Sequence, residues 1–129
     1  MTTLGIQKTL DIGFDAALAR VPEALKAEGF GVLTEIDVKE TLKKKLDVDF
    51  RRYRILGACN PPFAHKALEH SLDVGMLMPC NVIVYERDDG KTEVSAVDPM
   101  LTMAAQGDPA IRPLAAAVQE KLRKVIDSL

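Results

Sequence analysis

Residues 80–97 read CNVIVYERDDGKTEVSAV, and this stretch decides the fold. Apolar residues alternate on both sides of Asp89-Gly90, and an Asp-Gly pair between two alternating runs is a strong signal for a β-hairpin. We therefore expect strands over 80–86 and 92–97, joined by a tight loop. Because a hairpin pairs its strands antiparallel, the sheet is expected to be built around an antiparallel pair.

Upstream of the hairpin, sequence patterns typical of strands alternate with patterns typical of helices. Alternating or apolar runs predict strands over 4–12, 31–36 and 53–59. Between them, and after the hairpin, apolar residues recur every three or four positions, as on one face of a helix. The predicted order is β-α-β-α-β-α-β-β-α. We expect an α+β fold in a single domain over residues 1–129, with a sheet of about five strands. Two long helices would cover one face, and the open face would favour a partner subunit.

The second helix is expected to be short and to begin after Asp37. Asp37 is a favoured N-cap residue, and Glu40 three positions later completes the pattern of a capping box. The spacing of Val38, Leu42 and Leu46 predicts one apolar stripe that faces the interior.

Glycine and proline mark other helix boundaries. Gly29 follows the stripe of the first long helix and fits the C′ position, which favours a left-handed conformation. Pro22 lies inside that stripe, removes one backbone donor and predicts a kink. Asp108-Pro109 is expected to open the last helix, since Pro suits a first helical position.

Composition restricts the class of protein. The 129 residues carry 17 Lys and Arg against 19 Asp and Glu, and aromatic residues make up only 5%. Nucleic-acid binders rely on a basic excess and on stacking, so we expect no nucleic-acid partner. No apolar run reaches the ~18 residues of a membrane span, and the N-terminus lacks the pattern of a signal peptide. With only two cysteines, the expected protein is soluble and cytoplasmic, without a membrane partner.

A thiol stands at the predicted end of the third strand, directly before a helix. Cys59 is followed by Asn60, a favoured N-cap, and by Pro61, which suits the first helical position. Free N–H groups and the helix dipole at such a position favour an anion, including a thiolate. His65, just inside this helix, is expected to point to the same place.

The hairpin brings a second group of polar residues to the same edge of the sheet. If the hairpin loop has two residues, Asn81 lies opposite Asp98; if it has three, Cys80 does. In either register a carboxylate, an amide and a thiol are expected to meet. The candidate binding residues are therefore Cys59, Asn60, His65, Cys80, Asn81 and Asp98.

Three interpretations of this cluster are carried forward. A small-molecule-binding or thiol-dependent module would use Cys59 as thiolate and His65 as base, with an asparagine amide as donor. A structural or interaction domain would use the cysteines only as small buried hydrophobes. A zinc-type site would take its ligands from Cys59, His65, Cys80 and Asp98, although this spacing matches no common zinc motif. The sequence does not identify a cofactor, and enzymatic activity is one alternative among these.

Four blocks of the sequence resemble a known family in the same order. They are residues 29–42, 53–61, 78–82 and 95–99, within a similarity that runs from about Phe14 to Met103. This pattern is similar to the family catalogued as domain of unknown function 302, which contains bacterial and archaeal proteins without an established activity. The resemblance singles out Cys59-Asn60-Pro61, Cys80-Asn81 and Asp98-Pro99.

The resemblance implies a curved, largely antiparallel sheet that carries two long helices, similar to the TATA-binding-protein-like arrangement. It also implies a homodimer. The chain departs from the family pattern at two positions. Pro22 stands where a good helix former is usual, and Asp47 stands where the family tends to have glycine. We expect Asp47 to adopt the left-handed conformation, which Asp tolerates better than most residues.

Overall fold

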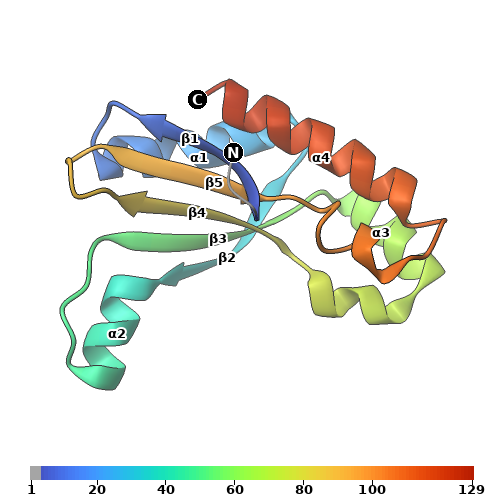
Figure 1. The fold of residues 1–129 in the computed structure, drawn as a ribbon, viewed down its shortest axis with the longest axis horizontal. Helices are drawn as coiled ribbons and strands as arrows, with labels where there is room; N and C mark the ends of the chain where they lie inside the picture. Colours follow the sequence, from blue (N-terminus) through green and yellow to red (C-terminus); the bar gives the residue numbers. More distant parts are fainter. Residues whose placement is uncertain (1–3) are drawn as a thin grey trace.

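The computed structural model describes residues 4–129, and its centre is a five-stranded sheet with the order β1-β5-β4-β3-β2 (Figure 1). All four neighbouring pairs are antiparallel. The strands are β1 (Gly5–Leu10), β2 (Gly31–Asp37), β3 (Tyr53–Cys59), β4 (Cys80–Glu86) and β5 (Thr92–Val97). The helices are α1 (Phe14–Ala27), α2 (Val38–Leu46), α3 (Pro61–His70) and α4 (Arg112–Asp127), with the short 3-10 helices η1 (Leu72–Leu77) and η2 (Ala104–Gln106). The predicted α+β class and element order are confirmed.

Helices α1 and α4 lie on one face of the sheet and enclose the main core (Figure 1). The core packs Val21 and Leu25 of α1 and Leu122 of α4 against strand residues such as Leu56 and Val84. On the opposite face, partly exposed residues of β3 pair with those of β4, and the rings of Tyr53 and Tyr85 stack with centroids 5.3 Å apart. The expected sheet with one face covered by two long helices is therefore present.

The hairpin has the longer of the two loops considered. Glu86 pairs with Thr92 and the N–H of Arg87 donates to the carbonyl of Lys91, which leaves Asp88, Asp89 and Gly90 in the loop. Gly90 has a φ of 82°, a left-handed value that glycine adopts without steric cost.

Two turns follow the predicted conformations. Gly29 has a φ of 86°, its N–H donates to the carbonyl of Lys26, and the N–H of Phe30 donates to that of Leu25, which together form a Schellman motif. Asp47 has a φ of 54°, the left-handed value expected there. Helix α1 continues on both sides of Pro22.

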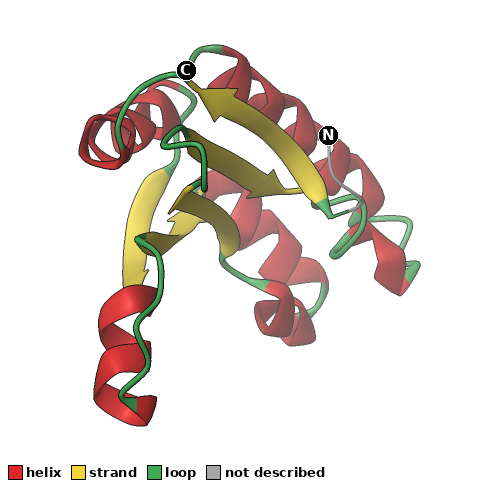
Figure 2. Cartoon of the chain, turned by 60° about the vertical axis from the view of Figure 1, so that its left-hand side comes forward, coloured by secondary structure: helices red, strands yellow, loops and turns green. Residues whose placement is uncertain are grey.

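Helix α2 differs from the expectation that its apolar stripe faces the interior. The carboxylate of Asp37 accepts the N–H of Glu40, as the cap predicted, but every residue of α2 is at least partly exposed, and Leu46 is 66% exposed. The helix extends beyond the edge of the sheet in both views (Figures 1 and 2). An apolar stripe indicates which side of a helix is expected to be buried. It does not specify whether the surface that buries this side belongs to the same chain or to another one.

The last helix begins later than expected. The carboxylate of Asp108 accepts the N–H of Ala110, and the carbonyl of Asp108 accepts the N–H of Ile111, so these residues form a turn. Helix α4 starts at Arg112, with Pro113 in its first turn. Asp-Pro suits a turn as well as a helix start, and here the turn precedes the helix. Among residues 4–129, no helix is long and apolar enough to cross a membrane.

Candidate functional site

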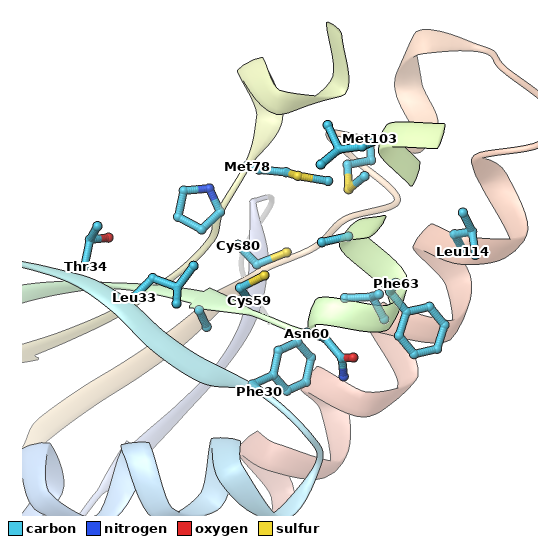
Figure 3. A pocket seen from close by; sticks show the side chains of 15 residues that line it. Phe30, Leu33, Thr34, Cys59, Asn60, Phe63, Met78, Cys80, Met103 and Leu114 are labelled. Carbon is cyan, nitrogen blue, oxygen red and sulfur yellow. The ribbon is translucent and has the colours of Figure 1, made fainter. Parts of the chain in front are cut away.

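A cavity of about 300 Å³ lies where β3 ends and β4 begins, bounded by α3 and α4 (Figure 3). None of the fifteen residues that line it is charged. Its apolar wall includes Phe30, Phe63, Leu68, Leu114 and Val118. Its sulfur-bearing residues are Cys59, Met78, Cys80 and Met103. The amide of Asn60 and the hydroxyl of Thr34 are the polar side chains among the lining residues, apart from the thiols.

Strand pairing places the two cysteines together. Cys80 is the cross-strand partner of Ala58, the residue before Cys59. Cross-strand partners lie about 5 Å apart and chain neighbours about 3.8 Å apart, so the Cα atoms of the cysteines are roughly 6 Å apart. Both are free thiols, and Figure 3 shows their sulfur atoms directed to the same part of the cavity.

The environment of Cys80 does not favour a thiolate. Burial raises the pKa of its thiol to about 11, and the neighbouring Cys59 adds to the rise. A thiol with this pKa is protonated at neutral pH, and the protonated form is a poor nucleophile. The reactive-thiol interpretation therefore receives no support from Cys80.

Asn60 holds the entrance to α3 in a way that the sequence did not indicate. It occupies the N-cap position, but its side chain makes no capping hydrogen bond to α3. Its Nδ2 instead donates to the carbonyl of Glu28 at 3.2 Å, which ties the start of α3 to the end of α1. Pro61 and Pro62 have no N–H, so the first backbone donor of α3 belongs to Phe63. The expected group of free N–H donors beside Cys59 is thus reduced.

A bulge in β2 forms the rim of the cavity. The register between β2 and β3 shifts between Val32 and Thr34, so Leu33 has no partner in β3 and lies at the cavity with Thr34. Such bulges turn side chains away from the regular alternation. Gly57 allows this arrangement, because a Cβ atom there would contact the hydroxyl of Thr34 and lie 2.7 Å from Cγ of Pro79.

Two of the six candidate residues, His65 and Asn81, lie outside this cavity. The side chain of His65 is 77% exposed, and its Nδ1 lies 3.7 Å from Oε1 of Glu69 on the same helix. Asn81 pairs with Gly57 and is exposed in a shallow hollow on the open face of the sheet. The expectation that His65 serves Cys59 as a base is therefore wrong in geometry.

Asp98 is buried, but it is committed to a structural role. It is 4% exposed, its Oδ1 accepts the N–H of Met100 at 2.9 Å, and Nε2 of Gln119 lies 3.0 Å from both carboxylate oxygens. These bonds join the segment after β5 to α4. Asp98 does not line the cavity, so the expected meeting of carboxylate, amide and thiol does not occur, although the three-residue hairpin loop brings Cys80 to this end of the sheet.

The zinc-type interpretation also needs correction. Within residues 4–129, no group of three or more His, Cys, Asp and Glu side chains is arranged to hold a metal ion. His65 is on the surface and Asp98 is bonded to Gln119, so neither joins the cysteines. Of the six candidates, Cys59, Asn60 and Cys80 share the cavity.

Sequence analysis missed most of the apolar wall. Phe63 and Leu68 could have been found, because both belong to the helix that begins directly after the candidate residues Cys59 and Asn60. Met103 lies in a segment without periodicity, and Val118 belongs to a stripe that looks like ordinary core. Apolar lining residues carry the same sequence signal as core residues, since both avoid water.

The sheet, the helices and the cavity define an α+β protein with an uncharged, sulfur-containing cavity at one end of an antiparallel sheet. The chain belongs to the family described as Domain of unknown function DUF302, whose model matches residues 6–129.

A solved structure supports this assignment. The crystal structure of an uncharacterized conserved protein DUF302 from Bacillus stearothermophilus is 32% identical, with a TM-score of 0.89 over 98% of each chain. No curated protein matches the sequence.

Proposed function

We propose that this protein binds a small, neutral and largely apolar molecule in the cavity beside Cys59 and Cys80. The observation that carries the proposal is a cavity of about 300 Å³ with no charged lining residue. Ligand sites are typically concave and apolar, with a few polar groups that orient the ligand. Here Asn60, Thr34 and the two thiols would be those groups.

The size and polarity of the cavity limit the ligand. Ligand pockets typically measure about 300–1,000 Å³, so a cavity of about 300 Å³ suits a small ligand. A charged ligand would lose its hydration without meeting an opposite charge, which is costly. The wall of Phe63, Leu68 and Leu114 favours an aromatic or aliphatic group.

Naphthalene, which has ten carbon atoms, is a direct probe for this cavity. We expect a dissociation constant on the order of 100 μM, measured by fluorescence anisotropy, because the gain from burial is reduced by the cost of association. Naphthalene-1-sulfonate should bind at least about tenfold more weakly, since its charge finds no partner.

The variant Ala64→Leu tests where naphthalene binds, because Ala64 lines the cavity and a larger side chain would fill it. We expect a loss of roughly tenfold or more in affinity. Ala116→Leu on the exposed side of α4 is the matched control and should bind as the wild type does. Equal affinity for the sulfonate, or an unchanged Ala64→Leu variant, would contradict the proposal.

We also propose that two copies of the chain associate through α2 and the adjoining strand β2. Strand β2 is at the edge of the sheet, and large apolar residues are exposed along it, at the end of α2 and along the segment that follows α2. These residues are Leu33, Ile36, Leu46, Val48 and Phe50. A second copy that covered this surface would explain an amphipathic helix without buried residues.

Sedimentation equilibrium checks this association. We expect twice the chain mass of 14.1 kDa for the wild type and the chain mass itself for Leu46→Glu. Leu72→Glu is the matched control, because Leu72 is 86% exposed at the other end of the molecule. The proposal is wrong if the wild type is monomeric or if both variants dissociate equally.

A further inference from the structure

Sulfur is concentrated at one place in this molecule. The sequence contains two cysteines and five methionines, and both cysteines line the cavity together with Met78 and Met103. Figure 3 shows the cysteine sulfurs at the sheet end of the cavity and the two methionine side chains on the wall above them. A cavity meant only to hold an apolar molecule needs no such set, because aliphatic side chains would serve equally well.

The two thiols are close enough to act on one ligand. Their Cα atoms are roughly 6 Å apart by strand register, and Figure 3 shows both sulfur atoms directed to the same part of the cavity. Each comes from a different strand of a paired sheet, so the separation of their Cα atoms is set by the backbone ladder and not by a flexible loop. The site is therefore partly preorganised, which favours binding.

The sulfur ligands that these cysteines and methionines offer favour one kind of metal ion. Zinc prefers four ligands from thiolate, imidazole and carboxylate groups, and the described residues offer only two of these at the cavity. Thiolate and thioether ligands together are typical of monovalent copper. Cu(I) also accepts as few as two or three soft ligands, and its single charge suits an apolar cavity better than a divalent ion does.

We propose that the thiolates of Cys59 and Cys80, with the thioether of Met78 or Met103, form a binding site for one Cu(I) ion. The site goes beyond the binding of an apolar molecule and does not depend on it. Binding requires both thiols to lose a proton, so one Cu(I) enters and two protons leave. The resulting pair of thiolates and copper carries a net charge of −1, with no change in the oxidation state of copper or sulfur.

The fold supplies some stabilisation for this negative charge. Helix α3 begins two residues after Cys59, so the positive end of its dipole lies close to this thiol, although Pro61 and Pro62 reduce the number of N–H groups there.

The test is an anaerobic titration of the reduced full chain with Cu(I) in competition with bathocuproine disulfonate, followed by absorbance. We expect one Cu(I) per chain and a loss of roughly 100-fold or more in affinity for Cys59→Ser and for Cys80→Ser, since each removes a ligand. Met78→Leu and Met103→Leu together should cost about tenfold. Met76→Leu is the matched control, because Met76 is 82% exposed and lies outside the cavity.

Two further measurements keep the inference testable if a serine variant fails to fold. X-ray absorption of the wild-type copper complex should show sulfur as the nearest shell; a shell of nitrogen and oxygen would overturn the site. Serine variants that fold and bind copper like the wild type would overturn it as well. Naphthalene binding separates this inference from the proposed function, because a protein that binds naphthalene but not Cu(I) loses only the copper site. A protein that binds Cu(I) but not naphthalene would contradict only the proposed binding of an apolar ligand.

Discussion

Asp98→Ala is expected to lower the free energy of unfolding by about 2–4 kcal/mol without changing the affinity for naphthalene. The substitution removes a buried carboxylate that accepts from the N–H of Met100 and from the amide of Gln119. Hydrogen bonds to a charged group contribute about 1.5–3 kcal/mol, and donors left buried without a partner add to the loss. Urea unfolding of the wild type and the variant measures the difference.

A double variant provides the control for this prediction. Gln119→Leu removes the donor that faces Asp98, so in the double variant the amide of residue 119 is no longer left without its acceptor, and only the N–H of Met100 loses its partner. We expect the double variant to lose less stability than the two single variants added together. If Asp98→Ala kept full stability but no longer bound naphthalene, Asp98 would belong to the ligand site, contrary to the structure.

Gly57→Ala is expected to lower the free energy of unfolding by about 1–3 kcal/mol and to weaken naphthalene binding as well. A Cβ atom at this position would contact the hydroxyl of Thr34 and the ring of Pro79, and both residues line the cavity. Crowding of this kind is relieved by movement of side chains and backbone, which costs energy. Urea unfolding and fluorescence anisotropy measure the two effects.

Gly31→Ala is the matched control, because Gly31 is also a strand glycine and a Cβ atom there would have no neighbour within 4 Å. We expect a change within about 0.5 kcal/mol and unchanged naphthalene binding. A Gly57→Ala variant as stable as Gly31→Ala would show that Thr34 and Pro79 can move at little cost in free energy. In that case, close packing around Gly57 would not determine the shape of the cavity.

Together, these two substitutions distinguish a residue that only stabilises the fold from a residue that also shapes the ligand cavity. Asp98 is held by α4 and the segment after β5, away from the cavity, whereas Gly57 shapes the rim through its neighbours. Stability should fall in both variants, but ligand affinity should fall only in Gly57→Ala. A role for Asp98 in ligand binding, which was one of the interpretations left open by the sequence, predicts the opposite pattern.

The local parts of the fold followed from sequence because each depends on few neighbours. The strands of the hairpin, the glycine after α1, the Asp37 cap and the left-handed Asp47 are all present as expected. Each of these features is decided by backbone conformation or by bonds between residues close in the chain. The cap of α3 was the exception, because the amide of Asn60 bonds to Glu28, which is distant in sequence.

The candidate site was predicted only in part, for reasons of side-chain direction. The pairing of Ala58 with Cys80 brings the two cysteines close together, and the strand pattern of the sequence did not specify that these two strands pair. The positions of His65 and Asp98 depended on which way each side chain turned. His65 turned to solvent beside Glu69, and Asp98 turned toward Gln119.

The sequence by itself determined that this chain forms an antiparallel α+β sheet and that its two cysteines stand at strand ends. The tertiary structure alone decided that these thiols share an apolar cavity with Met78 and Met103, that Asp98 and His65 do not, and that α2 extends beyond the sheet. The physical reason is that periodicity and capping are properties of short segments. A cavity is the space left between elements distant in the chain, and its walls carry the same apolar residues as the core.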